Sequence, residues 1–124
     1  MNISDLHDSH LIGLSVDREK RGRLLFELAG GRRTTLVLEG VQYLQADNFR
    51  QGNIVLDVVI QKGADCDESY LEQLFGKEYL EQNKAFKESL GARIGSGELV
   101  LVAIEPSYGC VLVALCKLYD WTEN

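Results

Sequence analysis

The chain has 124 residues, of which 45% are hydrophobic and 26% are charged. This composition is typical of one globular domain and differs from that of disordered chains. Thirteen basic and nineteen acidic side chains give a formal net charge of -6, which disfavours binding to nucleic acid and to anionic membranes. No stretch approaches the roughly 20 apolar residues of a membrane-spanning helix, and the first residues lack the pattern of a secretion signal. We therefore expect a single cytoplasmic domain over residues 1–124.

The first third of the chain shows three segments in which apolar and polar residues alternate, as they do in half-buried strands. The segments cover residues 10–17, 23–29 and 32–40, and turn-forming glycines separate them. We expect antiparallel strands, the first two forming a hairpin. The apolar residues expected to share one face in each strand are Ile12, Leu14 and Val16; Leu24, Phe26 and Leu28; and Leu36 and Leu38.

The middle of the chain is less regular. Residues 41–53 have weak periodicity and predict an irregular connection or a short edge strand. Alternation resumes over residues 53–61. The side chains expected on one face of this strand are Ile54, Leu56, Val58 and Ile60.

A helical segment follows over residues 69–91. Asp67 or Ser69 can cap its first turn, because a side-chain oxygen there accepts a hydrogen bond from a free backbone amide. Gly76 is expected to break or bend the helix, and Gly91 is a plausible end.

Two apolar segments close the chain, residues 97–105 and 109–119, with a turn expected at residues 106–108. Both are apolar on both faces, which is typical of central strands covered on two sides. The sequence thus predicts an α+β fold: a mostly antiparallel β-sheet of about six strands, in the order β-β-β-(β)-β-α-β-β, with one helical segment packed on it.

Cysteine usage points away from metal and redox chemistry. Cys66, Cys110 and Cys116 are an odd set without C-x-x-C spacing. Cys110 and Cys116 fall in one expected strand, about 20 Å apart at roughly 3.3 Å per residue, too far for a disulfide. We expect buried, unpaired thiols and no cofactor.

Both histidines lie in the short stretch LHDSH. In a helix, His7 and His10 would share a face and could bind a metal ion, with Asp5 or Asp8 supplying an oxygen ligand. In an extended chain they point to opposite faces, and the alternation that begins at His10 is that of a strand. The favoured interpretation is a structural lead into the first strand, and the alternative is a metal site formed by His7, Asp8 and His10.

Carboxylates in or beside strands offer a second chemistry. Asp47, Asp57 and Glu105 are placed so that two of them could meet across a sheet as acid and base. The simpler interpretation of Asp57, which alternates with Val55 and Val59, is a solvent-facing strand carboxylate.

A surface that binds a protein partner requires fewer specific residues than a catalytic or metal site does. Tyr119 and Trp121 lie just beyond the last expected strand, where aromatic side chains can provide contact area or pack into the core. Glu68 and Glu72 belong to an acidic group on the helix, which could steer a basic partner or form the solvated face of the helix.

The stretches LHDSHLIGLSVD, LEGVQYLQADNFRQGNIVLDV and IEPSYGCVLVALCKL resemble a group of small bacterial domains of mostly uncharacterised function, some of which are assigned as immunity proteins of polymorphic toxin systems. The resemblance implies a β-rich domain and supplies no catalytic residues. Our first hypothesis is a non-enzymatic protein-binding domain that neutralises a toxin by covering its active surface. The alternatives are a small metal-dependent hydrolase using the His-Asp segment, and a self-associating module that forms a homodimer through an edge strand.

Overall fold

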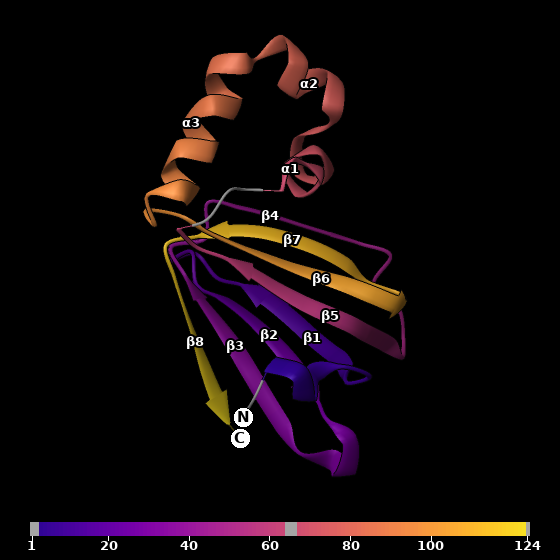
Figure 1. Cartoon of the computed structure of the whole chain (residues 1–124). Coiled ribbons are helices and arrows are strands. Elements are labelled where there is room, and N and C mark those ends of the chain that lie inside the picture. The colour runs from indigo at the N-terminus through magenta and orange to yellow at the C-terminus, as the bar shows by residue number, and fades with distance from the viewer. Residues whose placement is uncertain (1–2, 64–66, 124) are drawn as a thin grey trace.

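Antiparallel β-structure dominates the computed structural model, which describes residues 3–63 and 67–123. Eight strands form one sheet in the order β4-β7-β6-β5-β1-β2-β3-β8, and every neighbouring pair is antiparallel (Figure 1). The predicted α+β class with an antiparallel sheet is confirmed, but the sheet has eight strands, not about six.

The strands are β1 (His10–Val16), β2 (Gly22–Glu27), β3 (Arg33–Glu39), β4 (Tyr43–Asp47), β5 (Asn53–Gln61), β6 (Val100–Tyr108), β7 (Val111–Cys116) and β8 (Leu118–Glu123). The helices are α1 (Glu68–Phe75), α2 (Lys77–Gln82) and α3 (Lys84–Gly95), and two short 3-10 turns are η1 (Ile3–Leu6) and η2 (Ala29–Gly31).

The additional strands arise at one sharp corner of the sheet. β3 pairs with β8 and β4 pairs with β7, while the backbone amide of Lys117 donates to the Glu39 carbonyl oxygen at 2.9 Å and that of Gln42 donates to Leu115 at 2.9 Å. The β3–β8 and β4–β7 pairs are therefore continuous with each other and form one bent pair of strands. This pair connects the two edge strands of the curled sheet, β4 and β8. Gly40 allows the bend, because it has φ +65° and a Cβ atom there would lie 2.9 Å from the Lys117 side chain. The predicted strand over residues 109–119 is thus divided at Lys117.

The sheet is covered on both faces of β6 and β7, as predicted. One core lies inside the curl of the sheet, where Val102 and Leu112 meet apolar residues of β2 and β3. The second core lies under the helices, where Leu101 and Val113 contact residues such as Leu90 of α3. Figure 1 shows the three helices together above the β4-β7-β6 side of the sheet.

The predicted faces of two strands are confirmed only in part, because each strand contains a bulge. Leu14, Val58 and Ile60 pack against the core inside the curl, as expected. The register of β1 shifts between Leu11 and Gly13, so Leu11 is buried whereas Ile12 and Val16 are exposed. The register of β5 shifts on both sides of Val55, which is buried, and Leu56 is exposed. A bulge adds one residue and moves the side chains that follow it to the opposite face.

The helical segment begins as predicted but ends differently. Asp67 caps α1, accepting a hydrogen bond from the backbone amide of Ser69 at 3.0 Å. The segment is interrupted at Gly76, as expected, and again at Asn83, so it forms three helices. Gly91 does not end it, because α3 continues to Gly95.

The expected turn at residues 106–108 is also wrong. β6 extends through Pro106 to Tyr108, and the chain turns at the following Gly109. Proline fits here because it lies at an irregularity of the β5–β6 ladder, next to Val55. None of the helices within the described residues is long and apolar enough to cross a bilayer.

Candidate functional site

Two carboxylates lie directly opposite each other on the central strands. Asp57 of β5 is the register partner of Glu105 of β6. They follow the same alternation as the next pair, Val59 and Ala103, which packs in the core under the helices. The two acids therefore lie on the helix-covered face, with Asp57 exposed and Glu105 half-buried. The sequence raised this pairing as a hypothesis, and the register brings the two residues together.

Tyr70 of α1 holds one of these carboxylates. Its hydroxyl group donates a hydrogen bond to Oε1 of Glu105, and its ring is buried in the core under the helices. Burial raises the pKa of Tyr70 far above its ordinary value, and the hydrogen bond to Glu105 and the charges of Glu105, Asp67 and Asp57 raise this pKa further. The phenol thus keeps its proton and stays a donor. We call Asp57, Asp67 and Glu105, gathered around Tyr70, the acidic face.

The strand pair of Asp57 and Glu105 has no cation beside it within the described part of the chain. None of the ion pairs among the described residues includes Asp57 or Glu105. Like charges directly opposite each other on a sheet destabilise it by roughly 0.2–1 kcal/mol. The fold therefore tolerates an unfavourable arrangement at this point, and arrangements of this kind concentrate at functional sites.

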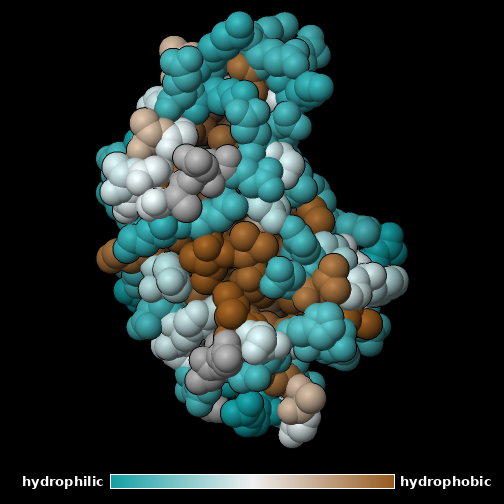
Figure 2. Space-filling model, in the orientation of Figure 1, coloured by the Kyte–Doolittle hydropathy of each residue, from teal (hydrophilic) through white to brown (hydrophobic). Residues whose placement is uncertain are grey.

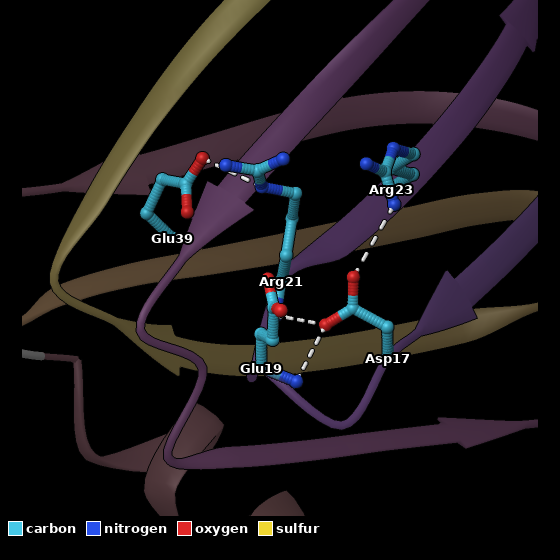
Figure 3. A network of polar contacts seen from close by, with 5 residues as sticks. All are labelled: Asp17, Glu19, Arg21, Arg23 and Glu39. Carbon is cyan, nitrogen blue, oxygen red and sulfur yellow. Dashed lines mark hydrogen bonds and ion pairs between the residues drawn. The ribbon is translucent and has the colours of Figure 1, made fainter.

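Two acidic residues near the β1–β2 hairpin, Asp17 and Glu39, have arginine partners (Figure 3). Nε of Arg21 donates to Oε1 of Glu39 at 2.9 Å, and NH1 of Arg23 lies 3.7 Å from Oδ2 of Asp17. Asp17 also accepts hydrogen bonds from the backbone amides of Glu19 and Arg21 at 2.9 and 3.0 Å. Asp17 and Glu39 thus each have an arginine partner, whereas Asp57 and Glu105 have no cationic partner among the described residues.

The residues proposed from the sequence as partner contacts are not brought to one surface. Glu68 and Glu72 lie on α1, where Glu68 forms an ion pair with Lys87 at 3.0 Å. Tyr119 and Trp121 were predicted to lie just beyond the last strand, but they lie within the edge strand β8. Figure 1 shows α1 and β8 in separate parts of the molecule.

The two aromatic residues of β8 differ in exposure. Trp121 is half-buried, with its ring centroid 6.1 Å from that of Phe26 in the core inside the curl. Tyr119 is 38% exposed. Core packing therefore accounts for most of Trp121, and Tyr119 is the member of the pair that a partner could contact.

The LHDSH segment ties the N-terminus to β5. The ring nitrogen Nδ1 of His7 donates to the Leu56 carbonyl oxygen at 2.8 Å, while Nε2 lies 3.6 Å from Oδ2 of Asp8. The backbone of Asp8 and Ser9 is hydrogen-bonded to Val55. No three His, Cys, Asp or Glu side chains among the described residues are arranged to hold a metal ion. The metal alternative with His7, Asp8 and His10 gains no support from this geometry.

The remaining candidates lie apart from the acidic face. Asp47 is exposed on β4 and accepts a hydrogen bond from Gln45 at 2.8 Å. Cys110 and Cys116 are buried free thiols, and burial raises the pKa of Cys116 to about 11. Thiols of this kind are protonated and unreactive near neutral pH. Cys66 lies outside the described residues.

Exposed apolar surface accompanies these polar features. Figure 2 shows an apolar area over the sheet, below the helices. Large side chains of the sheet with more than two-fifths of their surface exposed include Ile12, Val16, Leu56 and Tyr108. Contiguous apolar surface on a soluble domain is typical of a site that contacts another molecule.

Sequence reasoning missed Tyr70, because its role depends on where α1 meets β6. Its only sequence signal is its position three residues after the cap residue Asp67, at the start of an apolar helix face. Comparison with protein-family models, with curated proteins and with solved structures finds no match to this chain.

Proposed function

We propose that this chain is a non-enzymatic protein-binding domain whose acidic face docks on a basic surface of its partner. The observation that carries the proposal is the register pair of Asp57 and Glu105, two like charges that form no ion pair with any described cation. A lysine or arginine side chain from a partner would turn this repulsion into two attractive contacts. The arrangement that destabilises the free domain would thus stabilise the complex.

The acidic face is ordered before any partner arrives. Glu105 is held by Tyr70, and Asp67 is held by the amide and hydroxyl groups of Ser69 at 3.0 and 2.8 Å. Carboxylates fixed in this way lose little side-chain freedom on binding, which favours affinity. Arginine is the best-suited partner residue, because its planar guanidinium group can donate to two carboxylate oxygens at once.

The biological role that we propose is neutralisation of a toxin, as an immunity protein acts on its cognate toxin. Its support is the resemblance of the three stretches described above, together with the net charge of -6. A toxin that acts on nucleic acid presents a basic active surface, and an acidic domain can cover that surface. Such a pair would meet in the cytoplasm.

The test is co-expression with the product of the neighbouring gene, followed by co-purification and a growth assay. We expect a complex and relief of toxicity. The double variant Asp57→Asn/Glu105→Gln should lose most of the complex at physiological salt, because it removes the charges and keeps the side-chain shapes. Asp120→Asn is the control, since it removes a carboxylate from β8, away from the acidic face. Absence of a complex, or equal binding by the double variant, would overturn the proposal.

A further inference from the structure

A pocket of about 460 Å³ lies where the start of β1 meets the turn between β4 and β5. Its walls are residues 10–12 on one side and residues 49–52 on the other. This volume is within the range of sites that bind small molecules, roughly 300–1,000 Å³. The pocket does not include any residue of the acidic face.

One buried side chain fixes both walls. Asn53 is 2% exposed, and its Oδ1 accepts hydrogen bonds from the backbone amides of Arg50 at 2.8 Å and Cys110 at 3.0 Å. Its Nδ2 donates to the Leu11 carbonyl oxygen at 3.1 Å. The turn and β1 are therefore held at a set separation. A cavity with walls fixed in advance binds a ligand with little loss of conformational freedom.

The pocket carries cationic donors and no carboxylate. Nε of Arg50 donates to Oδ1 of Asn48 at 2.9 Å, which orients the guanidinium group, and the two terminal amino groups have no hydrogen-bond or ion-pair partner among the described residues. Arg50 forms no ion pair with any acid in the described part of the chain. Arg50 is an exposed side chain held by Asn48, and a guanidinium group can bind a carboxylate through charge-assisted hydrogen bonds.

His10 supplies a second polar group to the pocket. It also borders a smaller cavity of about 130 Å³, which Asp8 and Glu27 line. Glu27 is already paired with Arg33 at 3.2 Å. His10 thus borders both cavities, and acidic residues line only the smaller one.

An aromatic side chain completes the lining. Phe49 is 46% exposed at the tip of the turn, and the other wall contributes Leu11 and Ile12. Phe49 and its neighbour Arg50 are both exposed, so the ring of a ligand would bury part of the phenylalanine surface on binding. The ring and the guanidinium group together match a planar apolar body that carries a negative group.

We propose that this pocket binds an aromatic carboxylate, with the carboxylate on the terminal amino groups of Arg50 and the ring against Phe49 and Ile12. The ligand would be a small molecule or the carboxyl end of a peptide with a C-terminal aromatic residue, and both present the same chemistry. This site is separate from the acidic face and does not depend on the proposed function.

The test is a titration of the full chain with small ligands. Binding is detected from changes in the NMR amide signals of residues 10–12 and 49–52. The probes are benzoate, benzamide and N-acetyl-phenylalanine. We expect saturable shifts with benzoate and none of comparable affinity with neutral benzamide. Arg50→Gln should weaken benzoate binding about tenfold or more, the effect of losing a charge-assisted hydrogen bond. Tighter binding of N-acetyl-phenylalanine than of benzoate identifies a peptide end as the ligand, and the reverse order identifies a small molecule.

Arg18→Gln is the matched control, because it removes an exposed arginine from the β1–β2 turn. It should bind benzoate as the unmodified chain does, and so should Asp57→Asn. The spectrum of each variant shows that it is folded. The proposal is overturned if benzoate gives no saturable shifts, if benzamide binds equally well, or if Arg50→Gln and Arg18→Gln behave alike.

Discussion

The side-chain oxygen of Asn53 fills the space that a Cβ atom on Gly109 would need. Gly109 has φ +90° and begins the turn from β6 to β7, while Asn53 begins β5. The same oxygen binds the amide of Cys110, the residue after the glycine. The Asn53 side chain and the absence of one at Gly109 therefore join the start of β5 to the β6–β7 hairpin, which lies far away in the sequence.

Gly109→Ala should destabilise the domain by about 2–4 kcal/mol, from the strain of a positive φ and the displacement of the Asn53 hydrogen bonds. Gly30→Ala is the matched control, because Gly30 has φ +84° with no atom within 4 Å of its Cβ position. It should lose only the conformational part, about 1–2 kcal/mol. Urea unfolding measures both variants. Equal losses would show that the contact with Asn53 has no energetic role.

Asp57→Asn should stabilise the free domain by a few tenths of a kcal/mol, up to about 1, because it removes the repulsion across β5 and β6. The same change should weaken binding to the basic partner. Urea unfolding and a binding assay on one preparation measure the two effects, with Asp120→Asn as the reference for loss of one surface charge. A loss of stability in Asp57→Asn would mean that the carboxylate is structural, and the proposed interface would lose its basis.

The strand and helix pattern could be predicted because alternation and turn residues are local signals. Leu24, Phe26 and Leu28 share a buried face, as expected from their spacing. The faces of β1 and β5 could be predicted only in part, since the bulges near Leu11 and Val55 depend on pairing with other strands.

The divided last strand has a similar cause. Nothing in the apolar run that ends at Cys116 marks a corner, and Lys117 turns the chain only because Gly40 of the neighbouring strand lets it approach. Part of the candidate site could be predicted from the sequence. Asp57 and Glu105 could be named as possible partners, whereas their register and the contact with Tyr70 are properties of the folded chain.

Tyr70 should make the stability of the domain sensitive to alkaline pH. Its pKa in the folded state lies well above the value of about 10 in the unfolded chain. The stabilising contribution of the protonated phenol is therefore complete below about pH 10 and declines as pH rises above it. Tyr70→Phe should be less stable near neutral pH by about 1–2 kcal/mol, through loss of the hydrogen bond to Glu105.

The difference in unfolding free energy between the unmodified chain and Tyr70→Phe should shrink as pH rises past about 10. Urea unfolding at a series of pH values measures it. Tyr79→Phe, which removes an exposed phenol, is the control and should show no such trend. A difference that stays constant with pH would mean that Tyr70 ionises as readily in the folded chain as in the unfolded one.

Asp17 should act at the opposite end of the pH range. The backbone amide of Arg21 has the largest effect and lowers the pKa of Asp17. Desolvation, the second-largest effect, opposes it, and the amide of Glu19 and the charges of Arg23 and Arg21 lower the pKa further (Figure 3). A carboxylate with a lowered pKa stabilises the fold above its unfolded pKa of about 4, and this contribution is lost as pH falls through the folded pKa. Asp17→Asn should therefore be less stable than the unmodified chain near pH 7. The two chains should converge in urea unfolding near pH 2, whereas Asp120→Asn should follow the unmodified chain at both pH values. If the deficit of Asp17→Asn persisted at low pH, the turn would depend on the shape of the aspartate side chain and not on its charge.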